Sequence, residues 1–232
     1  MLTHSKNKMN ILELQLLSSD ILQTKRFYHE ILGLSIIQAD DLSIRISAGR
    51  SALQFKNVND QNPFYHFAFN IPANKFEEAH AWANKRVQLM PITLSTNIAD
   101  FKNWNAKAFY FFDNNQNIVE FIARFDLDNN SDKAFDGSSI FSISEIGLVV
   151  DNAKAYSEKF LEEGGLNFFS RQPPQDDFVA IGDDHGLFIV VNNKRNWYPT
   201  SKPAAKFWTS IKIEENGKVT DIEMDEITTN FS

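Results

Sequence analysis

The fold is indicated first by residues 11–17, which read Ile11-Leu12-Glu13-Leu14-Gln15-Leu16-Leu17. Leucine alternates with polar residues here, a period of two that is typical of a strand with one buried face. Asp20 follows as a predicted helix N-cap with Gln23 three residues later, the spacing of a capping box. The predicted helix runs from about 21 to 32 and stops at Gly33. Short strands are then expected at 35–38, 42–47 and 51–56, which completes a β-α-β-β-β unit.

The same order of elements recurs along the chain. A second alternating strand reads Tyr65-His66-Phe67-Ala68-Phe69-Asn70, and a predicted helix at 74–84 follows it, with closing strands at 108–112 and 118–123. A third alternating strand covers 143–150. Its predicted helix ends at Gly164-Gly165, and its strands are expected near 166–170, 178–181 and 187–191. Residues 207–213 resemble one further strand, so a fourth unit would be incomplete.

A polar segment separates the second unit from the third. Residues 126–138 include Asn129-Asn130-Ser131-Asp132 and few apolar side chains, which is typical of a linker. We therefore expect two domains. Residues 10–126 would hold the first two βαβββ units, and residues 139–232 would hold the third unit with the partial fourth. The expected fold class is α+β.

The composition limits the kinds of partner. The 232 residues carry a net charge of −7, which argues against nucleic acid or an anionic membrane as a partner. No apolar run approaches the roughly 20 residues of a membrane span. Because the chain has 0 cysteines, disulfides, zinc–thiolate sites, iron–sulfur clusters and thiol nucleophiles are excluded. A cytoplasmic location is expected, and the 21 phenylalanines predict a large core or a ring-lined pocket.

Two motifs resemble those of the vicinal oxygen chelate superfamily, which includes glyoxalases, fosfomycin-inactivating enzymes, extradiol dioxygenases and bleomycin-binding proteins. Phe27-Tyr28 followed by Leu32-Gly33-Leu34 is similar to the FY…LGL helix end of that family. Phe111-Phe112-Asp113 leading to Asn117-Ile118-Val119-Glu120-Phe121 is similar to its closing DPxGNxxE strand, although Asn114 and Gln116 replace the Pro and Gly. The resemblance implies that paired units form a cup-shaped mixed sheet, with helices outside, around a divalent metal ion.

In that superfamily the metal ligands come from the first and last strand of each unit. Carried over position by position, the first-strand sites are Glu13 and His66, and the last-strand sites are Gln54 and Glu120. The alternation agrees, since it turns all four side chains away from the helices. Two carboxylates, an imidazole and an amide oxygen suit Zn, Ni, Fe, Mn or Co. Glu13 or Glu120 could also act as a general base.

Other residues support weaker hypotheses. Glu145 holds the first-strand position of the third unit. Trp104 and Tyr110 could line the cup or the core, and residues 195–199 resemble a loop that follows the last strand in some relatives. His185 lies in an acidic segment that we expect to be a hairpin turn. A solvated sheet face is the alternative interpretation of the polar positions on these strands.

The leading functional hypothesis is a glyoxalase-like, metal-dependent lyase or isomerase that acts on a small oxygen-chelating substrate. The alternative is a non-catalytic small-molecule binding protein of the bleomycin-resistance type, with an aromatic ligand in the Phe-rich cup. An extradiol-type dioxygenase is less favoured, because such enzymes usually take two histidines and one glutamate. The sequence leaves open whether the cup closes within one chain or between two chains of a homodimer.

Overall fold

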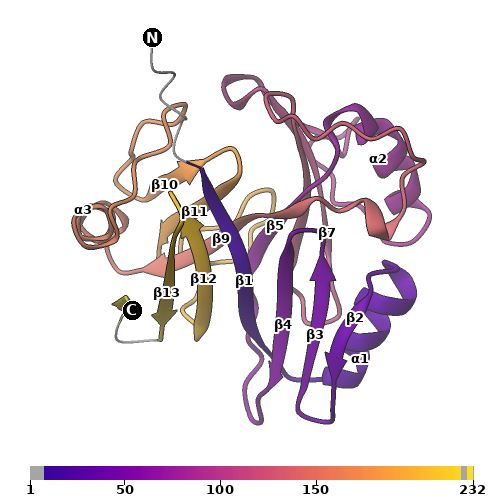
Figure 1. The fold of residues 1–232 in the computed structure, drawn as a ribbon, viewed down its shortest axis with the longest axis horizontal. Coiled ribbons are helices and arrows are strands. Elements are labelled where there is room, and N and C mark those ends of the chain that lie inside the picture. The colour runs from indigo at the N-terminus through magenta and orange to yellow at the C-terminus, as the bar shows by residue number, and fades with distance from the viewer. Residues whose placement is uncertain (1–7, 226–228, 232) are drawn as a thin grey trace.

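The structure, a computed structural model, describes residues 8–225 and 229–231 (Figure 1). Its strands form one large mixed sheet, with the helices α1, α2 and α3 at the periphery. The α+β fold class expected from the sequence is therefore confirmed. The sheet is open and does not close into a barrel. Within the described residues no helix combines the length and the apolar character that a membrane span requires.

The four sequence units appear in order. The first contains β1 (Met9–Ser18), α1 (Ile21–Lys25), the π-helix η1 (Arg26–Ile31), β2 (Ile36–Ala39), β3 (Ser43–Ala48) and β4 (Ser51–Asn57). The second contains β5 (His66–Asn70), η2 (Ala73–Lys75), α2 (Phe76–Asn84), β6 (Ala99–Phe101), η3 (Lys102–Trp104), β7 (Ala106–Phe112) and β8 (Ile118–Arg124). The third contains η4 (Gly137–Ser139), β9 (Ser142–Val150), α3 (Ala153–Gly164), β10 (Phe178–Asp183) and β11 (Gly186–Asn192). The fourth contains β12 (Thr209–Glu215), β13 (Lys218–Met224) and β14 (Thr229–Phe231).

Two local expectations are corrected. The strand predicted near 166–170 is reduced to a single bridge between Phe168 and Ile181. The fourth unit continues beyond its first strand as a meander of antiparallel strands, with no helix among its described residues. Its first turn contains Asn216 and Gly217, both at positive φ, which is the usual chemistry of a tight hairpin.

The units pair in a different combination from the expected one. We expected the first and second units to share a cup. Instead β1 pairs with β12, so that the first unit joins the fourth, and β5 pairs with β9, so that the second joins the third. We call these the first half (β2-β3-β4-β1-β12-β13-β14) and the second half (β6-β7-β8-β5-β9-β11-β10) of the sheet.

The two halves meet where Ile11 of β1 pairs with Ile143 of β9. Strand pairs therefore cross the predicted boundary at 126–138, and each half takes strands from both of the predicted domains. The alternating pattern identified the strands and their faces, but it contains no information about which strand lies next to which. The division into domains at 10–126 and 139–232 stays a prediction.

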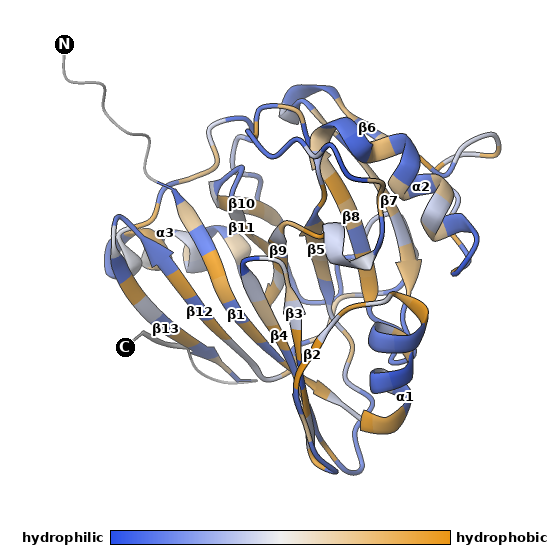
Figure 2. Cartoon of the chain, turned by 45° about the vertical axis from the view of Figure 1, so that its right-hand side comes forward, coloured by the Kyte–Doolittle hydropathy of each residue, from blue (hydrophilic) through white to orange (hydrophobic). Residues whose placement is uncertain are grey.

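One face of the sheet carries the larger of two apolar clusters, and the second lies on the opposite face of the second half, around Ala68. Leu14, Leu16, Leu53 and Phe55 in the first half, like Phe67 in the second, are fully buried in one continuous apolar cluster. Figure 2 shows the underlying pattern, with hydrophobic and hydrophilic residues alternating along β1, β12 and β13. Burying these side chains is the main favourable contribution to folding.

The two sequence motifs meet at one buried contact. The hydroxyl of Tyr28, in the π-helix, donates a 2.6 Å hydrogen bond to Oδ2 of Asp113, in the turn between β7 and β8. The same carboxylate accepts hydrogen bonds from the backbone N–H groups of Asn115 and Asn117 and from the side chain of Asn117. The motif residues thus connect the first unit to the second, and their role here is structural.

This contact predicts the effect of Tyr28→Phe. The substitution removes one partner of a buried carboxyl group and should lower the free energy of unfolding by about 1–3 kcal/mol. Urea denaturation followed by circular dichroism measures it. Tyr198→Phe, at a half-exposed ring on the surface, is the matched control and should leave stability nearly unchanged. Equal losses in the two variants would contradict the structural role of the Tyr28–Asp113 contact.

Candidate metal centre

Three titratable side chains converge around Ala68 in the second half. Ala68 of β5 pairs with Glu120 of β8 on one side and with Glu145 of β9 on the other. His66 lies two residues earlier on β5 and so faces the same side of the sheet. One potential ligand atom from each of His66, Glu120 and Glu145 lies within 4.8 Å of the other two, and all three residues are buried. The small side chain of Ala68 leaves the space that these larger groups occupy.

His66 is held as a neutral imidazole with a defined tautomer. Its Nδ1 lies 3.1 Å from the carbonyl oxygen of Ile118, which can only accept, so Nδ1 carries the proton. Nε2 therefore presents its lone pair toward Glu120, whose Oε2 is 3.5 Å away. Burial lowers the pKa of His66 to about 4. A histidine whose other nitrogen donates to a backbone carbonyl is the usual arrangement of a metal ligand.

The two carboxyl groups disfavour each other's charge. Burial raises the pKa of Glu120, and the nearby Glu145 raises it further, while Arg124 acts in the opposite direction. Burial also raises the pKa of Glu145, against the lowering effect of the Arg124 guanidinium. The Tyr110 hydroxyl hydrogen-bonds to Glu120. Two buried carboxylates beside a neutral imidazole form an environment that is stabilised by added positive charge.

A cavity of about 250 Å³ opens beside the three groups. Half of its lining residues are Phe, Tyr or Trp, namely Phe101, Trp104, Tyr110, Phe178, Trp197 and Tyr198. The Trp197 ring lies 5.1 Å from the His66 ring, and a side chain on Gly147 would collide with that indole. Tyr198, 47% exposed, packs edge-on against Tyr110. The cavity can therefore hold a small molecule with at least one flat, apolar face.

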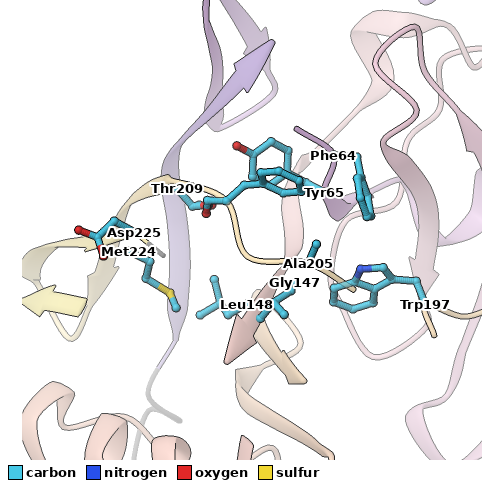
Figure 3. Close-up of a pocket in the computed structure, with 11 residues that line it drawn as sticks. Phe64, Tyr65, Gly147, Leu148, Trp197, Ala205, Thr209, Met224 and Asp225 are labelled. Carbon is cyan, nitrogen blue, oxygen red and sulfur yellow. The ribbon is translucent and has the colours of Figure 1, made fainter. Parts of the chain in front are cut away.

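A second, much smaller void lies behind Trp197, where the two halves of the sheet meet (Figure 3). It measures about 10 Å³, and Phe64, Tyr65, Gly147 and Thr209 are among its lining residues. A space of that size holds about one water molecule. The void therefore reflects packing between the halves, and the larger aromatic cavity is the candidate ligand site.

The structure brings together only two of the four predicted ligands. His66 and Glu120 meet, as expected, but Glu13 and Gln54 lie on β1 and β4 in the first half. The Glu13 carboxylate accepts hydrogen bonds from Arg45, at 2.5 Å, and from Gln15, at 2.7 Å. The expectation of one shared site is wrong because β9 lies between β1 and β5 and supplies Glu145 instead.

The place that the fourth ligand would take is apolar. In the second unit, the last-strand ligand Glu120 pairs with Ala68, which is two residues after His66. In the third unit, Ile189 holds the equivalent position, because it pairs with Gly147, which is two residues after Glu145. The centre therefore offers three donors and one apolar wall. Pattern reasoning could have found Glu145 from its first-strand position, whereas Arg124 carried no signal.

The smaller expectations are also resolved. Trp104 and Tyr110 line the cavity, and so do Arg195, Trp197 and Tyr198 from the segment that follows β11. His185 lies in the turn between β10 and β11, as expected for a hairpin. The peptide bond between Tyr198 and Pro199 is cis.

Comparison with known proteins identifies the fold. No protein-family model and no curated protein sequence matches this chain. Among solved structures, a proposed dioxygenase from Bacillus subtilis aligns with a TM-score of 0.59 and 14% identity, over 94% of this chain and 86% of its own. Glyoxalase I from Zea mays aligns with a TM-score of 0.56 and 14% identity, over 90% of this chain and 75% of its own.

The chain therefore has the fold of the vicinal oxygen chelate superfamily, as the sequence motifs implied. At this level of identity the likeness concerns the fold and leaves the reaction undefined.

The state of His66 predicts a pH dependence of stability. Its folded pKa of about 4 lies below the value of about 6.5 for an unfolded histidine, so the unfolded state takes up the proton first. The contribution is present in full above about pH 6.5 and is lost as the pH falls toward 4, by up to about 1.4 kcal/mol per pH unit. Urea denaturation of the chelator-treated protein at several pH values measures it.

His66→Gln should remove this part of the slope between pH 6.5 and 4. His29→Gln, which removes a histidine of the π-helix η1 in the first unit, is the control and should keep the wild-type slope. If His66→Gln keeps the wild-type slope, the imidazole is not held neutral as described.

Proposed function

We propose that this protein is a metal-dependent enzyme of the glyoxalase type, a lyase or isomerase that acts on a small oxygen-chelating substrate. The observation that carries the proposal is the convergence of His66, Glu120 and Glu145 at an aromatic cavity. Buried clusters of two carboxylates and an imidazole are costly for stability, and they are found mainly at functional sites.

The residues present fit a divalent ion. The imidazole tautomer leaves Nε2 available, and the two carboxylates need positive charge nearby. One nitrogen and two oxygen donors suit Zn, Ni, Fe, Mn or Co, with positions left for a substrate. An extradiol-type dioxygenase is less favoured, since that chemistry usually uses two histidines and one carboxylate. Because the three donors come from one chain, the proposed site does not require the predicted homodimer, which stays a prediction together with the cytoplasmic location.

When bound, the ion would supply Lewis-acid polarisation of a chelated pair of substrate oxygens. The remaining tasks fall to the protein. Glu120 lines the cavity and is hydrogen-bonded by Tyr110, so it is placed to move a proton at its carboxylate oxygen. The rings of Trp104, Trp197 and Tyr198 exclude water and hold the substrate flat against the centre.

The cavity also limits the substrate. At about 250 Å³ it is smaller than the roughly 300–1,000 Å³ of typical ligand pockets. Arg195 at its edge is paired with Asp177 at 3.2 Å. A compact substrate with two neighbouring oxygens and an apolar face fits these walls better than a large, multiply charged one.

The metal content of purified protein tests the proposal. Protein prepared without chelator should contain about one divalent transition-metal ion per chain, and Glu120→Gln should lose it, because this change removes a charged ligand at constant shape. Glu13→Gln, the matched change in the first half, should keep it. Elemental analysis gives the content. Equal metal content in Glu120→Gln and wild type would contradict the site assignment. Loss of the metal in Glu13→Gln but not in Glu120→Gln would contradict it as well.

A second candidate function is a non-catalytic binding protein for flat aromatic ligands. The observation that favours it is the aromatic lining, together with a guanidinium that already balances part of the carboxylate charge. This protein would bind its ligand without metal, and Glu120→Gln would leave that binding intact.

Tryptophan fluorescence separates the two candidates. A binding protein stripped of metal should show saturable quenching by flat aromatic compounds, reported by the indoles of Trp104 and Trp197 that line the cavity. Trp104→Phe and Trp197→Phe should each remove a large part of the quenching. Trp82→Phe on α2, outside the cavity, is the control and should remove little. Quenching that persists in both cavity variants would place the ligand elsewhere.

A further inference from the structure

Arg124 is the charged residue of the centre that the proposed function leaves without a role. It is the last residue of β8, four positions after Glu120, and its side chain is fully buried. Its guanidinium lies 5.4 Å from the Trp104 ring and 5.9 Å from the Phe169 ring. Burying a guanidinium costs free energy unless its N–H groups are paired, so the partners of Arg124 indicate its role.

The guanidinium has three polar partners. Nη2 donates to Oε1 of Glu145, Nε donates to the hydroxyl of Ser144 at 3.2 Å, and Nη1 lies 3.4 Å from Oδ1 of Asp184. Glu145 links Arg124 to the centre, because it contacts Arg124 and also lines the cavity beside His66 and Glu120. Since Oε1 is engaged by Arg124, the carboxylate cannot rotate freely, and Oε2 is the oxygen left to bind an ion.

A positive charge next to a metal site could also repel the ion, so the two effects must be weighed. On the side away from Glu145, Asp184 balances the guanidinium, and Arg171 in turn contacts Asp184 at 3.1 Å. Arg171 also contacts Asp126, at 2.5 Å, so charges alternate from the centre outward. Asp184 offsets part of the guanidinium charge, which weakens the repulsion between Arg124 and an ion at the centre. The test below measures whether the orientation of Glu145 or the remaining repulsion has the larger effect.

We propose that Arg124 is a positioning residue that holds Glu145 for binding a divalent ion through one oxygen, and that it thereby raises the affinity of the centre for the ion. The inference rests on the metal-binding part of the proposed function. It adds that Arg124 on β8, which is not one of the three donors, raises their affinity for the ion.

Titration of the chelator-stripped full chain with Co²⁺ tests the proposal. Arg124→Gln should weaken Co²⁺ binding about 10–100-fold, the usual effect of removing a partner that orients a ligand. The visible absorption of bound Co²⁺ should change shape as well, since Glu145 would bind in another way; a purely structural role would leave that spectrum alone. Arg124→Lys keeps the charge without the fork geometry and should recover only part of the affinity.

The first half of the sheet offers a matched control. Arg45 contacts Glu13 at 2.5 Å, the same kind of arginine–glutamate pair outside the centre. Arg45→Gln should leave both the Co²⁺ affinity and the spectrum unchanged. Circular dichroism and thermal unfolding without the ion show whether each variant is folded.

The outcomes are distinguishable. A folded Arg124→Gln protein with unchanged or tighter Co²⁺ binding overturns the positioning role. Should Arg124→Gln fail to fold, Ser144→Ala removes only the partner of Nε; it should weaken Co²⁺ binding several-fold, and unchanged binding would overturn the role. A wild-type chain that binds no Co²⁺ rejects the metal-binding proposal itself, and the role of Arg124 falls with it.

Discussion

The antiparallel pairing of β5 with β9 is the contact on which the candidate centre depends. It sets Glu145 opposite Ala68, while the parallel pairing of β5 with β8 sets Glu120 on the other side of the same residue. Because side chains alternate between the two faces of a strand, a slip of one residue in β9 would turn Glu145 to the core face and dismantle the cluster. The register of this strand pair, more than any single hydrogen bond, therefore creates the site.

The stability of this region is best understood as a balance. Burying His66, Glu120 and Glu145 together costs free energy, since each group loses its hydration. The protein offsets part of that cost with the carbonyl of Ile118, the hydroxyl of Tyr110 and the guanidinium of Arg124. Replacing such a cluster by apolar side chains is often neutral or stabilising in proteins. Its presence in an otherwise apolar core is thus better explained by function than by folding.

The two motifs that resemble those of the superfamily stabilise the fold. Tyr28 and Asp113, one from each motif, meet in a buried hydrogen bond that ties the first unit to the second. Glu120, at the end of the second motif, is the member that lies in the centre. This division explains why the motifs identified the architecture reliably and said little about chemistry. It also agrees with structural neighbours that share the fold at 14% identity.

Local pattern by itself determined much of this protein. The alternation of apolar and polar residues predicted most strands and the faces they bury, and it turned His66 and Glu120 toward the same side. Those features depend on neighbours in sequence, so the sequence contains them. The tertiary structure alone decided which units pair. That choice left Glu13 in the first half, where it pairs with Arg45 of its own unit, and it placed Glu145, with Arg124 behind it, beside His66 and Glu120. Strand partners are selected by packing among segments far apart in the chain, and a period of two does not specify them.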